Sequence, residues 1–153
     1  MHLIPIPRDG SAKLSDVTLP DVALSVIAST VQMYERRGYV EPWVGYLAIE
    51  EGRCVGTCGF ASPPAGEVAE IAYFTFPDFE RRGIATRMAQ RLISIAQECD
   101  PSVKIIAMSG GGLGGSTGYL TLARQLGARW ALTKPFSGDE LRTAVAAVLA
   151  VEM

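Results

Sequence analysis

Histidine and cysteine are scarce in this chain, which has one histidine and three cysteines among 153 residues. The cysteines, Cys54, Cys58 and Cys99, lack CxxC spacing, so with His2 they make no zinc set. We expect them to be small buried thiols. A catalytic triad built on histidine is also excluded, because His2 lies at an end of the chain that we expect to be mobile. The sequence therefore predicts no metal site.

Basic clusters and long apolar runs are also missing. The formal net charge is −2, and no segment concentrates Lys and Arg as a protein that binds a nucleic-acid backbone would. No apolar run is long enough to cross a bilayer. The first residues, MHLIPIPRDG, lack the basic and then apolar regions of a secretory signal. We expect a cytoplasmic protein that binds neither nucleic acid nor membranes.

Apolar residues are abundant and make up 48% of the chain. A length of 153 residues fits one domain, because domains most often hold about 100 to 150 residues. So large an apolar share indicates a sheet covered on both faces or an oligomer interface, of which a homodimer is the simplest form. We expect residues 1–153 to form a single domain.

The order of the predicted elements indicates the fold class. Strand-like runs cover residues 3–7, 43–49, 54–60, 68–76, 103–108 and 130–133. Helical patterns cover residues 21–37, 84–97 and 117–126, and a capping box from Ser137 to Glu140 opens a last helix. Strand pairs come first, and strands alternating with helices follow. This order predicts an α/β fold with a mixed, twisted sheet and helices on both faces.

A strand, a turn and a helix follow one another between residues 70 and 97. The turn passes through Arg81, Arg82 and Gly83 and enters the helix with Ala85 in its first turn. The N-terminus of a helix offers unpaired backbone N–H groups and a partial positive charge, a geometry that binds phosphate oxygens. Gly83 allows close backbone approach, and Ala85 keeps the first helical turn slim. The alternative interpretation is an ordinary connection with two solvated arginines.

This stretch resembles the acetyl-CoA motif of GNAT acetyltransferases, whose pattern is Gln/Arg-x-x-Gly-x-Gly/Ala. Gly83 and Ala85 match the pattern, while Glu80 stands at the Gln/Arg position. Upstream, WVGYLAIEEGRCVGTCGF is similar to the strand pair of the family. The resemblance covers residues 1–107 and implies a GNAT-like acetyl-CoA-binding part.

The resemblance implies an N-acetyltransferase that moves an acetyl group from acetyl-CoA to a primary amine of a small molecule or peptide. Strands 68–76 and 103–108 would have to part to admit pantetheine, and a bulge in the first could aim an N–H at the thioester oxygen. Glu70 would be the base that deprotonates the amine, or else a carboxylate exposed to water, and Glu67 is a poorer candidate. The implied cofactor-binding residues are Phe74, Thr75, Phe76, Arg81, Arg82, Gly83, Ile84, Ala85 and Thr86. The family's acceptor pocket would involve Tyr34, Tyr39 and Trp43, which are otherwise ordinary core or surface aromatics.

The last third departs from the family. The family's tyrosine that protonates the leaving thiolate is replaced by Ala123, and Tyr119 would substitute as the acid unless it is a surface tyrosine. Residues 103–150 instead resemble the C-terminal half of a response-regulator receiver domain, with Ser109 and the Lys134-Pro135 pair, although no phospho-acceptor can be named. We therefore expect a receiver-like segment at 108–153 with an atypical βαβα end. The alternative function is a non-catalytic hybrid domain, binding CoA or a protein, that has lost the acceptor site.

Overall fold

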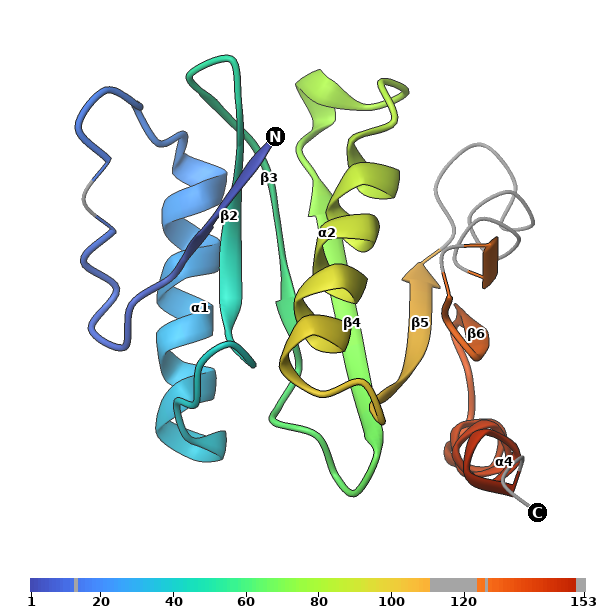
Figure 1. Cartoon of the computed structure of the whole chain (residues 1–153). Helices are drawn as coiled ribbons and strands as arrows, with labels where there is room; N and C mark the ends of the chain where they lie inside the picture. The colour runs from blue at the N-terminus through green and yellow to red at the C-terminus, as the bar shows by residue number, and fades with distance from the viewer. Residues whose placement is uncertain (13, 111–123, 126, 151–153) are drawn as a thin grey trace.

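The computed structural model describes residues 1–12, 14–110, 124–125 and 127–150. In this part of the chain, six strands form one sheet in which each strand lies beside the next in sequence. The strands are β1 (His2–Pro5), β2 (Gly45–Glu50), β3 (Arg53–Phe60), β4 (Val68–Thr75), β5 (Lys104–Gly110) and β6 (Trp130–Lys134). The first four pair antiparallel, and β5 and β6 extend the sheet in parallel (Figure 1). The predicted mixed sheet is confirmed.

Helices cover both faces of this sheet, as expected. A side chain at Gly45 would meet Thr30 of helix α1 (Asp21–Arg37) at 2.9 Å. A side chain at Gly56 would meet Met88 of helix α2 (Ile84–Cys99) at 3.2 Å. Gly45 lies opposite Gly59 in the neighbouring strand, so these two positions share a face. Gly56 is three positions from Gly59, and because side chains alternate along a strand it lies on the other face. Helices α1 and α2 therefore cover opposite faces of the sheet. Helix α4 (Gly138–Leu149) lies beside β6 (Figure 1).

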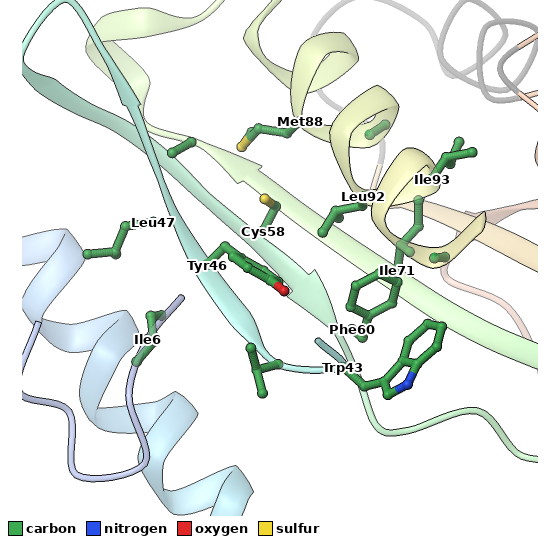
Figure 2. Packing of buried hydrophobic residues seen from close by; sticks show 14 of the residues in the cluster. Ile6, Trp43, Tyr46, Leu47, Cys58, Phe60, Ile71, Met88, Leu92 and Ile93 are labelled. Carbon is green, nitrogen blue, oxygen red and sulfur yellow. The ribbon is translucent and has the colours of Figure 1, made fainter. Parts of the chain in front are cut away.

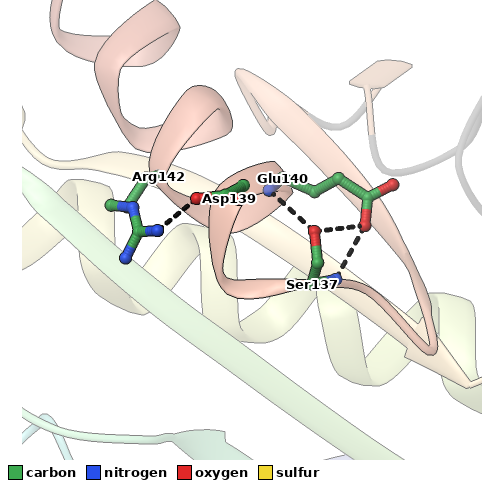
Figure 3. A network of polar contacts seen from close by, with 4 residues as sticks. All are labelled: Ser137, Asp139, Glu140 and Arg142. Carbon is green, nitrogen blue, oxygen red and sulfur yellow. Dashed lines mark hydrogen bonds and ion pairs between the residues drawn. The ribbon is translucent and has the colours of Figure 1, made fainter.

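Local sequence signals set the boundaries of several elements. The β2–β3 hairpin turns at Glu51 and Gly52, whose φ angles of 49° and 71° fit a two-residue turn with both φ positive. Ser137 and Glu140 form the predicted capping box of α4: the Ser137 hydroxyl accepts the N–H of Glu140 at 3.2 Å, and the Glu140 carboxylate accepts the N–H of Ser137 at 2.7 Å (Figure 3). Arg142 also pairs with Asp139 in the first turn of this helix.

The larger core lies between α2, the sheet and α1. Helix α2 buries one apolar stripe, including Met88, Leu92 and Ile93, against Cys58 and Ile71 of the sheet (Figure 2). Each fully buried side chain of this size contributes about 1.5–3 kcal/mol to folding. This packing fixes α2 on strands β3 and β4, and therefore fixes the turn that precedes the helix.

The cysteines divide into two kinds. Cys54 and Cys58 are buried as expected, and burial raises the pKa of the Cys58 thiol. The expectation is wrong for Cys99, which is exposed, because it lies in the last turn of α2 outside the buried stripe of that helix.

A smaller core holds the C-terminal end of the described chain. Ile106 and Met108 of β5 pack with Leu132 of β6 and with Ala144 and Val148 of α4. Beyond β5, the described chain includes the predicted last strand, which lies parallel to β5 as β6, and the predicted last helix, α4. The predicted helix at 117–126, with Tyr119 and Ala123, lies largely outside the described residues. The side chains of Ser109 and Lys134 are also outside the description.

Candidate functional site

Strands β4 and β5 part midway along their length. They pair from Val68 and Lys104 as far as Ile71 and Ala107. Beyond that point β4 continues to Thr75 paired with β3, and β5 continues to Gly110 paired with β6. The two strands therefore diverge at the end of the sheet where β4 leads into α2. This is the opening that the entry of pantetheine would require.

The turn before α2 presents backbone N–H groups at this opening. After the short helix η1 (Pro77–Phe79), the chain reaches Gly83, the N-cap of α2, in the left-handed region at φ 70° and ψ 16°. The first helical bond runs from the N–H of Arg87 to the carbonyl of Gly83 at 3.1 Å, and no side chain caps the helix. In the described chain, the N–H groups of residues 83–86 therefore have no protein acceptor. Such a helix start attracts anions.

Positive charge surrounds this turn. Arg81 and Arg82 are both exposed, and Arg81 adopts a positive φ of 61°. The Arg82 guanidinium lies 5.5 Å from the centre of the Phe79 ring, within the range of a cation–π contact. Positive φ angles at Arg81 and Gly83 flank Arg82. The sequence-predicted residues Arg81 to Thr86 are thus brought together in one turn.

Sequence reasoning missed a third arginine, Arg87, and its partner Glu50. Arg87 donates to the two carboxylate oxygens of Glu50 at 3.1 and 3.0 Å, and to the carbonyl oxygen of Arg82 at 3.0 Å. Glu50 ends β2 and is 37 positions away in the chain, so no local pattern could have shown the contact.

Thr75 has a polar atom without a partner at the opening. Its side-chain oxygen is buried and makes no hydrogen bond within the described chain. A buried hydroxyl without a partner costs about 1–3 kcal/mol, so such atoms in a folded protein call for a physical explanation. A ligand in the gap between β4 and β5 would supply one.

The hydrogen bonds and register of β4 show which of its backbone groups face the opening and whether the expected bulge is present. The N–H of Phe76 donates to the carbonyl of Val55 at 3.0 Å, and the carbonyl of Glu70 accepts the N–H of Ala61 at 3.0 Å. The direction of the backbone N–H and carbonyl groups alternates along a strand. The backbone groups of Phe74 therefore also point to β3, and those of Thr75 point to the opening. The expected bulge in β4 is absent, since the β3–β4 register runs without a shift. The register shift lies instead between β2 and β3.

Glu70, Ala72 and Phe74 form an open strip along β4, which we call the β4 strip. Ala72 lies opposite Gly59, the partner of Gly45, so the strip is on the face that α1 covers farther along the sheet. Helix α4 packs over this face near Val68 of β4 and Ile106 of β5. Between these helices Glu70 is half-buried, Ala72 is exposed and the Phe74 side chain is 45% exposed.

The other acidic and aromatic candidates are already engaged. Glu67 pairs with the buried Lys104 at 2.9 Å. The Tyr34 hydroxyl accepts the N–H of Gly45 at 2.8 Å and donates to the carbonyl of Ile6 at 3.1 Å, and burial raises its pKa. Trp43 is buried edge-on against Phe60.

The remaining aromatic candidate is Tyr39, whose hydroxyl donates to Glu41. This bond raises the pKa of Tyr39 to about 12. Tyr119, the predicted acid, lies outside the described residues.

Two comparisons with known proteins found matches. The model of the acetyltransferase (GNAT) family matches residues 19–109, and the receiver-like resemblance of residues 103–150 stays a prediction. No curated protein matches. A similar solved structure is that of yncA from Salmonella typhimurium, a proposed acetyltransferase, with its cofactor acetyl-CoA. The likeness has 18% identity and a TM-score of 0.44, covering 76% of this chain and 64% of the other, less than two thirds of its length.

Proposed function

This chain belongs to the GNAT acetyltransferase family, and we propose that it is an N-acetyltransferase that uses acetyl-CoA and a primary amine of a small molecule or peptide. The observation that carries the proposal is the parting of β4 from β5 beside the uncapped start of α2. A gap in the sheet next to an anion-binding turn suits a long ligand with a diphosphate in its middle.

The residues present fit such a ligand. The N–H groups of residues 83–86 would bind diphosphate oxygens, with Arg81 and Arg82 adding positive charge. The backbone of Thr75 faces the gap and would pair with the amide groups of pantetheine, as an added strand does. The buried Thr75 hydroxyl would gain its missing partner there.

When bound, acetyl-CoA supplies the acetyl group as a thioester. Glu70 is the proposed base: its carboxylate would accept one proton from the ammonium form of the acceptor. The freed nitrogen lone pair would form the new C–N bond as the C–S bond breaks, and the leaving sulfur would take a proton from an acid for which Tyr119 remains our candidate. The second proton that the nitrogen loses on becoming an amide would restore that acid. The β4 strip places Glu70 on an open face, where an amine can approach.

A substitution in the first turn of α2 tests the cofactor site. Ala85→Asp puts a negative charge where the diphosphate would lie, but an acidic residue there favours the helix itself. We expect isothermal titration to show acetyl-CoA binding weakened by at least about tenfold, since like charges at close range cost several kcal/mol. The thermal midpoint should not fall. The control is Gln90→Glu, which adds the same negative charge at an exposed position on the same helix.

Two outcomes would contradict the proposal at different levels. No binding of acetyl-CoA to the unaltered chain at millimolar concentration would remove the site as a whole. Normal binding to Ala85→Asp would place the ligand elsewhere.

A second candidate function follows from the C-terminal end. Strand β6 lies parallel to β5 and leads into α4, where the resembled family has an antiparallel strand pair that completes the acceptor site. A domain that binds CoA without transferring acetyl groups would fit this departure. An assay for released CoA thiol with a panel of primary amines separates the candidates: binding without amine-dependent release favours the non-catalytic domain.

A further inference from the structure

Arg87 lies where three elements meet. It belongs to the first turn of α2, and two of its nitrogens, Nε and Nη2, bond the Glu50 carboxylate at the end of β2. Its third nitrogen, Nη1, bonds the carbonyl oxygen of Arg82 in the turn. Every guanidinium nitrogen therefore has a protein acceptor. This arginine is committed to the protein, whereas Arg81 and Arg82 are exposed.

The bond to Arg82 fixes the orientation of one peptide group. The carbonyl of Arg82 and the N–H of Gly83 belong to the same planar peptide, and in a trans peptide these groups point in opposite directions. Because Arg87 holds the carbonyl oxygen on its own side, the Gly83 N–H points away from it. That N–H has no acceptor in the described chain. The contact thus presents an N–H group at the position proposed for the diphosphate.

Gly83 and Arg87 are also matched sterically. A side chain at Gly83 would come within 3.2 Å of Arg87 Nη1, and its φ of 70° already disfavours other residues. Glycine at this position leaves room for the Arg87 guanidinium to reach the carbonyl oxygen of Arg82.

Glu50 holds the arginine in place. A bidentate pair fixes the plane of a guanidinium as well as its position, which a single contact does not do. The pair also offsets the charge of Arg87, which would otherwise be free to turn toward an anion. The end of the β2–β3 hairpin is thereby linked to the turn through one side chain.

We propose that Arg87 and Glu50 are positioning residues that preorganise the turn at Arg82 and Gly83 for the diphosphate of the acyl donor. The inference rests on the proposed function and adds donor specificity to it. Acyl donors that carry a diphosphate would depend on the pair, and donors that end at pantetheine would not.

Two conservative variants test the pair. Arg87→Lys keeps the positive charge but loses the planar guanidinium that donates to the Glu50 carboxylate and the Arg82 carbonyl at the same time. Glu50→Gln keeps the shape of the side chain but loses its negative charge. We expect each variant to weaken acetyl-CoA binding about tenfold in isothermal titration, the effect of losing one hydrogen bond to a charged group. In acetyl-transfer assays KM for acetyl-CoA should rise while kcat is unchanged. Binding of S-acetylpantetheine, followed by ligand-observed NMR, should not change.

The controls make the same two substitutions, Arg to Lys and Glu to Gln, at neighbouring positions. Arg91→Lys lies one turn farther along α2, and Glu51→Gln lies next to Glu50; both residues are exposed, and neither should alter binding. The double variant of Glu50 and Arg87 should lose little more than either single variant, because the two side chains act together. If Arg87→Lys does not fold, Glu50→Gln carries the test alone.

The outcomes separate this inference from the proposed function. Normal acetyl-CoA binding by both variants, or an equal loss with S-acetylpantetheine, would overturn the inference and leave the acetyl-CoA site intact. Failure of the unaltered chain to bind acetyl-CoA would overturn both.

Discussion

The two halves of β4 are both largely apolar and differ in their surroundings. Residues 68–71 pair with β3 or its adjoining loop on one side and with β5 on the other, whereas residues 72–75 pair with β3 alone. Each half has three apolar or aromatic residues and one polar residue, Glu70 or Thr75, so the polar content does not distinguish them. What differs is the neighbour: β5 leaves β4 at Ala107 and continues along β6. In the proposed function, the first half of the strand belongs to the continuous sheet and the second half would bind the ligand.

The proposed chemistry depends on Glu70, which lies in the paired half of β4 and is part of the β4 strip. We expect Glu70→Gln to lower kcat by about 100-fold or more, since a positioned base contributes about 10² to 10⁴ in rate. Acetyl-CoA binding should remain, because the residue is outside the turn. Steady-state kinetics across about pH 6 to 9 measure the effect. Glu98→Gln, on the exposed end of α2, is the control, and normal turnover by Glu70→Gln would exclude it as the base.

Stability should distinguish the two halves directly. Ile71 is fully buried at the last β4–β5 pair, and we expect Ile71→Ala to lower the free energy of unfolding by about 2–5 kcal/mol. Phe74→Ala removes a larger side chain from the open half, yet we expect a loss of about 1 kcal/mol or less, because Phe74 is 45% exposed. Urea unfolding of both variants measures the difference. Equal losses would show that the halves are equally closed.

The smallest effect concerns Thr75 in the open half. Thr75→Val replaces a buried hydroxyl that has no partner with a methyl group of similar size. We expect the free energy of unfolding to rise by about 1 kcal/mol without ligand, and acetyl-CoA binding to weaken a few-fold. Thermal melts with and without acetyl-CoA would show both changes. Reduced stability without ligand would mean that the hydroxyl is satisfied in solution.

The sequence was sufficient for elements with local signals. Helix α1 spans residues 21–37 as predicted, with Pro20 before it and Gly38 after it, and the β2–β3 hairpin forms at its expected turn. The turn before α2 could also be predicted, since glycine and a following helix define it locally. These features depend on residues that are neighbours in the chain.

Features that depend on the meeting of distant residues could not be predicted. The Glu50–Arg87 pair and the buried Lys104–Glu67 pair each join positions 37 apart. The point where β4 leaves β5 is a matter of register, which the apolar pattern of either strand does not fix. The expected bulge in β4 came from the family resemblance, and this strand follows a regular register instead.

The order of the strands in the sheet has a consequence for how the chain folds. Because each strand pairs with the next one along the sequence, the sheet can grow from one edge as the chain leaves the ribosome. The β2–β3 hairpin needs only a two-residue turn, while the β4–β5 pairing must wait for α2 to be made and docked. The part of the sheet where β4 and β5 diverge is therefore among the later parts to assemble. A nascent chain would carry its β2–β3 hairpin well before the proposed acetyl-CoA site could form.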